Sequence, residues 1–156
     1  MTDAQAFIAR YGELFEHSAW VVERAADRLP FADLHDGLMG VVHDASPAEQ
    51  LALICAHPEL AGKAAIDRTL TDASAMEQAS AGLDRLTSDE FARFQALNAA
   101  YRERFGFPFL ICVRMTDKAG IFAAMAERLG HDRDDEIATA IAEIGKIVKL
   151  RLEDIP

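Results

Sequence analysis

Apolar residues recur along almost the whole 156-residue chain with a spacing close to 3.6, the period of an α-helix. The predicted helices cover about 2–16, 18–29, 33–43, 46–57, 87–105, 118–129 and 134–152, with a short helix over 63–68 and another that begins at 74. We find no linker, repeat or low-complexity stretch between them. The sequence therefore predicts a single compact all-α domain of about eight helices over residues 1–156.

Capping patterns sharpen several of these helix starts. Ser46 with Glu49, and Thr87 with Glu90, have the spacing of a capping box, in which each residue satisfies a free backbone N–H of the other. Ser74 with Glu77 has the same spacing, so we expect a helix to begin at Ser74, with residues 71 and 72 as alternative caps. This helix would place residues 74, 77 and 78 on one face.

One stretch departs from the helical pattern. Residues 105–114 combine Gly106 and Pro108 with a continuous apolar run, which suits either a buried strand or a buried helical segment. A lone strand in a helical protein would leave its backbone hydrogen bonds unpaired. We therefore expect a helical or irregular buried segment here.

Composition excludes several classes of function. The net charge of −10 argues against a nucleic-acid partner, and an anionic small ligand would need local donors to overcome it. No apolar run approaches the roughly 20 residues of a membrane span, and the acidic start lacks a signal-peptide layout, so we expect a cytoplasmic protein. The five histidines are scattered without metal-ligand spacing, and Cys55 and Cys112 lie in apolar runs typical of buried, reduced thiols.

His57 stands where a helix must end, because the residue before a proline is disfavoured in the α conformation and Pro58 has no N–H to donate. The negative end of the helix dipole would raise the pKa of this imidazole and keep a proton available near neutral pH. Two interpretations stay open from the local pattern: His57 caps the helix end, or it is a rigidly held acid/base.

Several motifs together resemble one family over essentially the whole chain. They are Glu16-His17-Ser18-Ala19-Trp20, Ala56-His57-Pro58-Glu59-Leu60-Ala61, Ser74-Ala75-Met76-Glu77-Gln78 with Ala81-Gly82-Leu83, Asn98-x-x-Tyr101-x-x-x-Phe105-Gly106-Phe107-Pro108-Phe109, and Glu143-Ile144-x-x-Ile147-x-x-Leu150-Arg151-Leu152. The sequence resembles the 2-oxo-4-hydroxy-4-carboxy-5-ureidoimidazoline (OHCU) decarboxylases of urate degradation. Glu59 stands where aspartate is common in that family.

The resemblance implies an all-α homodimer that decarboxylates OHCU to (S)-allantoin with no metal or organic cofactor. It implies that His57 is the catalytic acid/base, with Glu77 as a second functional residue. The implied substrate-binding residues are Pro58, Ser74, Ala75, Met76, Glu77, Gln78, Phe109, Leu110, Ile111, Cys112, Val113 and Arg151.

These residue types suit a small anionic, amide-rich substrate. An imidazole titrates near neutral pH, and Gln78 offers both a donor and an acceptor. The N-terminus of the predicted helix at Ser74 would present free N–H groups to an anion, and the backbone of 109–113 would pair with ring amides. Glu77 would bind substrate or orient His57. The alternatives are an inactive helical interaction module and a decarboxylase of a related ureido or imidazoline acid.

Overall fold

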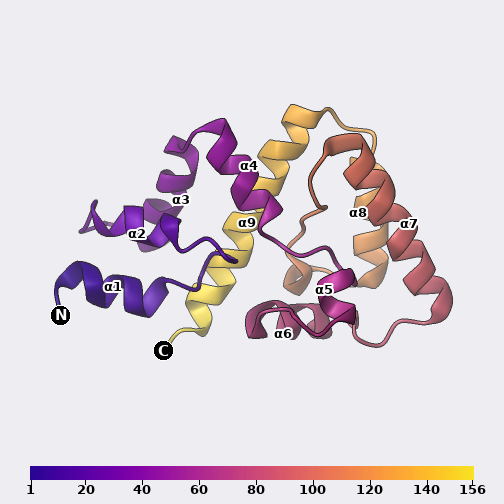
Figure 1. Cartoon of the computed structure of the whole chain (residues 1–156), viewed down its shortest axis with the longest axis horizontal. Coiled ribbons are helices and arrows are strands. Elements are labelled where there is room, and N and C mark those ends of the chain that lie inside the picture. The colour runs from indigo at the N-terminus through magenta and orange to yellow at the C-terminus, as the bar shows by residue number, and fades with distance from the viewer.

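The longest helix, α9 (Arg133–Asp154), runs through the middle of the molecule and separates two groups of helices (Figure 1). On one side lie α1 (Asp3–Tyr11), α2 (Trp20–Ala26), α3 (Leu34–Asp44) and α4 (Pro47–Cys55). On the other lie α5 (Lys63–Ile66), α6 (Asp72–Ser80), α7 (Ser88–Phe105) and α8 (Lys118–Arg128). This computed structural model describes residues 1–156, and its nine α-helices without a strand confirm the all-α prediction.

The core is one cluster of 28 buried apolar residues to which both groups of helices contribute. Tyr101 lies at the centre of its aromatic part, with ring centroids 4.6 Å from Phe105 and 5.3 Å from Phe109. The ring of Phe109 is therefore fixed against α7. This packing positions the start of the 109–113 segment.

Gly145 of α9 faces Met39 of α3. A Cβ atom at this position would lie 3.4 Å from the end of the Met39 side chain. His35 reaches the same place, where its Nε2 donates to the Gly145 carbonyl at 2.7 Å. This bond holds α3 against α9, which α4 also contacts.

Two capping boxes were predicted correctly, and other local predictions were wrong. Ser46 caps α4 and Thr87 caps α7, each with its Glu partner. The helix predicted over 18–29 is shorter, because α2 begins at Trp20 with Ala19 at the N-cap position and ends at Ala26. α1 ends at Tyr11, so the chain that follows it to residue 16 is not helical.

The 105–114 stretch is mostly extended and closes in a short 3₁₀ helix, η1 (Val113–Met115). Gly106 takes the left-handed conformation (φ 80°) that ends α7 and turns the chain into this run. The prediction of a buried, irregular segment is therefore confirmed. Cys112 is buried as expected, but Cys55 is exposed because it lies on the outer face of the last turn of α4.

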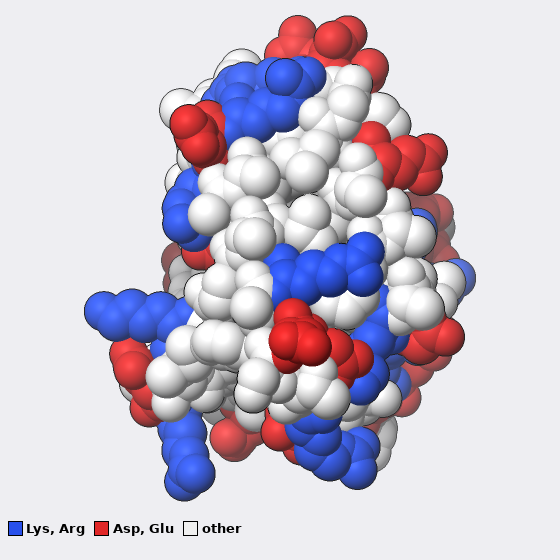
Figure 2. All heavy atoms as spheres, turned by 90° about the vertical axis from the view of Figure 1, so that its right-hand side faces the viewer, with Lys and Arg blue, Asp and Glu red and all other residues white.

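Charges of both signs are interspersed on the surface. On the face shown in Figure 2, a basic side chain lies at the centre directly above acidic ones, a largely uncharged area lies above it, and no single continuous basic area covers the face. None of the helices combines the length and the apolar character that crossing a membrane requires.

Candidate active site

His57 follows the end of α4, as the Pro58 argument predicted, and its ring turns back onto the helix. The Nδ1 atom lies 3.0 Å from the Leu53 carbonyl oxygen, one of the last carbonyls of α4. A carbonyl can only accept, so Nδ1 carries the hydrogen and donates it. Nε2 is then the unprotonated nitrogen of the neutral ring, and it has no hydrogen-bond partner in the protein. Nδ1 thus caps the helix end, and Nε2 is left free, so the role of His57 as an acid/base stays a prediction.

The expected rise in the pKa of His57 is wrong. Burial lowers the pKa from 6.5 to about 4, because the charged imidazolium is poorly solvated in the interior. The hydrogen bond to Leu53 and the charge of Glu16 oppose this shift but do not reverse it. The sequence could not reveal this, since the ring's 7% exposure is set by residues from other helices. At neutral pH the free site therefore holds a neutral imidazole.

Three amide side chains hold the loop after His57. Asn98 donates to the Leu60 carbonyl at 2.8 Å, and Gln95 donates to the Ala61 carbonyl at 2.9 Å. Gln78 accepts from the Ala61 N–H at 3.1 Å, so its acceptor is occupied and its amide N–H₂ group is the part left for a ligand. Ala61 itself has φ 50°, a left-handed conformation stabilised by these contacts.

A cavity with about 440 Å³ of empty space, its open mouth included, lies between this loop, α6, the 109–113 segment and α9. Its lining residues are His57, Pro58, Leu60, Ser74, Glu77, Gln78, Phe109, Leu110, Ile111, Cys112, Val113, Arg114, Ile147 and Arg151. The structure thus brings most of the predicted residues to one place, together with Leu60, Arg114 and Ile147, which were not predicted.

Ala75 and Met76 do not reach this cavity. Thr71, not Ser74, caps α6, and the helix begins at Asp72, so no capping box joins Ser74 to Glu77. Residues 74, 77 and 78 share the inner face as predicted, whereas 75 and 76 point outward and the Met76 side chain is 72% exposed. The prediction that they bind substrate was drawn from a continuous run, and the period of the helix excludes them from the inner face.

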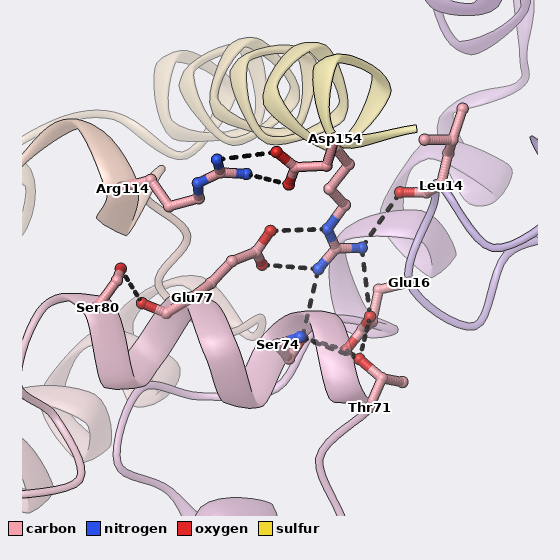
Figure 3. Close-up of polar contacts among 9 residues, drawn as sticks. Leu14, Glu16, Thr71, Ser74, Glu77, Ser80, Arg114 and Asp154 are labelled. Carbon is pink, nitrogen blue, oxygen red and sulfur yellow. Dashed lines mark hydrogen bonds and ion pairs between the residues drawn. The ribbon is translucent and has the colours of Figure 1, made fainter. Parts of the chain in front are cut away.

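One wall of the cavity is a buried group of charges that we call the Arg151 cluster: Arg151, Glu16, Glu77, Ser74 and Thr71. Arg151 donates two parallel hydrogen bonds to Glu77, both 2.8 Å, and Nη1 also contacts Glu16 at 3.4 Å (Figure 3). The hydroxyl of Thr71 donates to Glu16 at 2.9 Å, and Ser74 donates to the same carboxylate. Two carboxylates therefore face one guanidinium group.

This arrangement changes two expectations. The N-terminal end of α6 already faces the carboxylate of Glu16, so it is not a vacant anion site (Figure 3). Burial opposes the charge of Arg151, but Glu77 and Glu16 outweigh it and raise the pKa of Arg151 above its usual value. Arg151 therefore stays charged, and Glu77 orients it rather than His57.

The 109–113 segment offers free backbone groups to the cavity. The N–H groups of Ile111 and Val113, and the Ile111 carbonyl, make no hydrogen bond within the protein. Other groups of the segment are held from behind, where Arg128 donates to the Leu110 carbonyl at 2.5 Å and Cys112 N–H donates to Glu143 at 3.2 Å. A polar ligand can thus bond to this apolar run through its backbone, as expected.

Glu16 is the functional candidate that sequence reasoning missed. It is 2% exposed and lies 135 positions from Arg151, which it contacts. Its motif with Trp20 was recognised, but nothing in the local pattern shows that a carboxylate after a helix end is buried. No group of three or more His, Cys, Asp or Glu side chains is arranged to hold a metal.

Comparison with known proteins gives consistent matches. The family model for OHCU decarboxylase matches residues 1–153. A 2-oxo-4-hydroxy-4-carboxy-5-ureidoimidazoline decarboxylase of Haloferax volcanii is 44% identical, over 97% of this chain and 90% of that protein. A uric acid degradation bifunctional protein of Bacillus subtilis is 40% identical, over 98% of this chain and 31% of that protein. A crystal structure of (S)-allantoin synthase matches with a TM-score of 0.73 and 28% identity, over 98% of this chain and 50% of that one.

Proposed function

The chain belongs to the OHCU decarboxylase family, and we propose that it converts OHCU to (S)-allantoin and CO₂, with His57 moving the proton. It is a carboxy-lyase, whose reaction belongs to the degradation of urate. The observation that carries the role of His57 is its Nε2 atom: the ring lines the same cavity as Glu77 and Arg151, and this ring nitrogen has no hydrogen-bond partner in the protein.

The substrate's own ring can accept the electrons of the bond that breaks. OHCU carries a carboxylate and a hydroxyl on one ring carbon, next to a carbon that belongs to a C=N unit. When the bond to the carboxylate carbon breaks, its electron pair forms a double bond between the two ring carbons, and the former C=N pair takes up a proton on nitrogen. The resulting enol loses its O–H proton and gains a proton on the adjacent carbon, which gives allantoin.

His57 fits the proton transfers of the second stage. Its neutral Nε2 accepts the hydroxyl proton, and the imidazolium then returns a proton to one face of the adjacent carbon. Such general acid–base catalysis contributes about 10²–10⁴-fold. The lowered pKa supports proton acceptance as the first act of this residue, because the free site starts with the base form. Donation from one fixed side of the ring would produce a single enantiomer.

The other lining groups bind and orient the substrate. Arg151, held flat by the paired hydrogen bonds to Glu77, stabilises charge that develops on the ring oxygen. Ser74, the amide N–H₂ of Gln78 and the backbone of Ile111 bond to the polar atoms of the ring and the ureido group. Pro58, Phe109, Leu110, Cys112 and Val113 exclude water from the site.

The proposal also includes the oligomeric state and the cellular compartment of the protein. We expect a homodimer in the cytoplasm, as the family resemblance implies. Analytical ultracentrifugation at micromolar concentration tests the homodimer. One chain has a mass of 17.1 kDa, and a single species of that mass would contradict the homodimer.

The experiment generates the unstable substrate from urate with urate oxidase and hydroxyisourate hydrolase, and follows optically active allantoin by circular dichroism. Wild-type protein should accelerate its appearance, and His57→Ala should lower the rate by at least about 100-fold. Unfolding free energy should fall by only about 1 kcal/mol, the worth of the bond to Leu53.

His35→Ala is the matched control, since it removes a histidine that bonds a helix carbonyl outside the cavity. It should retain full activity. An unchanged background decay with wild-type protein would overturn the proposed reaction and favour an inactive module or a related acid as substrate. Equal activity of His57→Ala and wild type would remove His57 from the mechanism.

A further inference from the structure

Arg114 is a second cation at the cavity, and the reaction proposed above does not use it. It lies within η1, immediately after the 109–113 lining segment, and its side chain lines the cavity beside Arg151. Its guanidinium group is held by Asp154 through contacts of 2.7 and 3.3 Å (Figure 3). Asp154 is the last residue of α9.

The same residues line a wider cleft outside the cavity. This cleft holds about 1300 Å³ of space, open solvent included, and shares Glu77, Arg114 and Arg151 with the inner cavity. Asp154 lines only the outer cleft. The Arg114–Asp154 pair therefore lies at the boundary between the two spaces, near Glu77 (Figure 3).

Charge makes this boundary an obstacle for an anion. Three carboxylates, of Glu16, Glu77 and Asp154, face the two guanidinium groups of Arg114 and Arg151. The whole chain adds a net charge of −10. A substrate that brings another carboxylate must therefore displace one of the three or bind against repulsion.

The exposed fractions of the three carboxylate side chains indicate which one a substrate would displace from its arginine. The side chains of Glu16 and Glu77 are 2% and 13% exposed, and each would lose buried hydrogen bonds if displaced. Asp154 is 56% exposed, so water replaces Arg114 as its partner at little cost. Arg114 is also the more exposed cation, at 30% against 7% for Arg151.

We infer that Arg114 recruits the substrate by exchanging the carboxylate of Asp154 for the carboxylate of OHCU. The inference rests on the proposed function, since it concerns the same substrate. A guanidinium group matches a carboxylate with two parallel bonds, so the exchange preserves the bidentate geometry. Arg114 then acts on binding rather than on the proton transfers, and Asp154 competes with the substrate for it.

The test compares the KM for OHCU with inhibition by racemic allantoin, which lacks the carboxylate and gives no circular dichroism signal. Arg114→Gln should raise KM about 10- to 100-fold, the range for one hydrogen-bonded charge, with kcat within about twofold. The inhibition constant of allantoin should stay within about twofold. Asp154→Asn should lower KM, because Arg114 is then free.

Arg24→Gln and Asp44→Asn are the matched controls for charge. Arg24 forms a similar bidentate pair with Glu49, and Asp44 pairs with Arg28, both outside the cavity. Neither substitution should change KM by more than about twofold. Arg114→Lys should recover part of the affinity, and this variant replaces Arg114→Gln if the latter does not fold.

Three results would overturn the inference while leaving the proposed function intact. They are an unchanged KM in Arg114→Gln, equal weakening of substrate and allantoin, or a fall in kcat at constant KM. Failure of the wild-type protein to act on OHCU would instead overturn the proposed function itself.

Discussion

The protein buries two arginine–carboxylate clusters that differ in balance and in what they face. We call the second one the Arg128 cluster: Arg128, Glu136, Tyr101 and His131. The carboxylate of Glu136 is 0% exposed. It accepts hydrogen bonds from Arg128 at 2.8 Å, from the Tyr101 hydroxyl at 2.5 Å and from His131 at 2.9 Å. Burial alone would raise the pKa of Glu136, but these three hydrogen bonds outweigh it and lower the pKa.

The Arg151 cluster has the opposite composition, with two carboxylates on one guanidinium group, and three of its members line the cavity. The Arg128 cluster reaches the site only indirectly, through the Leu110 carbonyl behind the cavity wall. In the Arg128 cluster the bonds to Glu136 all come from the protein, although the Nη2 atom of Arg128 has no hydrogen-bond partner. The Arg151 cluster is open on the side where substrate would bind. We therefore expect a structural role for the Arg128 cluster and a functional one for the Arg151 cluster, although both pair an arginine with glutamate.

The largest expected effect is that Glu136→Gln and Glu77→Gln rank in opposite orders for loss of stability and for loss of activity. Glu136→Gln should lower the unfolding free energy by about 3–5 kcal/mol, because Arg128 is left buried without a charge partner. Glu77→Gln should cost only about 1–2 kcal/mol, since Arg151 keeps Glu16. In kcat/KM the order should reverse, with a loss of about 100-fold for Glu77→Gln, which misplaces Arg151.

Urea unfolding and the coupled allantoin assay measure the two quantities on the same samples. Equal losses of stability in the two variants would contradict the distinction between the clusters. A Glu77→Gln variant with wild-type kcat/KM would show that the open cluster is structural after all.

A smaller effect should appear in the pH dependence of stability. The pKa of His57 is lowered from 6.5 to about 4 by burial, so the unfolded chain binds this proton first as the pH falls. The stabilisation is fully present above pH 6.5 and is lost between that value and about 4, by about 2 kcal/mol at pH 5. The difference in unfolding free energy between wild type and His57→Gln, followed from pH 8 to 5, isolates it from the carboxylates. A constant difference would mean that His57 titrates normally.

Much of this site followed from short-range patterns. Helix periodicity placed residues 74, 77 and 78 on one face of α6, and Pro58 ended α4 beside His57. The apolar 109–113 run was expected to use its backbone, and the free N–H groups of Ile111 and Val113 allow it. These features depend on a few neighbouring residues, so the sequence carries them directly.

What the sequence did not predict depends on contacts between distant segments. Glu16 and Arg151 meet only because α9 crosses the loop that follows α1, and the pKa of His57 depends on how deeply that ring is covered. Thr71 and Ser74 both suit an N-cap, and in the structure Thr71 caps α6 while the Ser74 hydroxyl donates to the distant Glu16. Ala75 and Met76 were included because they lie between two inward residues in sequence.

The pH dependence of kcat/KM tests the central claim most directly, because this ratio reports ionisations of the free enzyme. With background decay subtracted, the account predicts a level profile from pH 8 down to about 5.5 and a fall below it, as His57 loses its base form toward a pKa of about 4. A value of kcat/KM that instead declines about tenfold per unit as the pH rises from 5 to 8 would show that the free enzyme must carry a protonated imidazole, and would contradict the account.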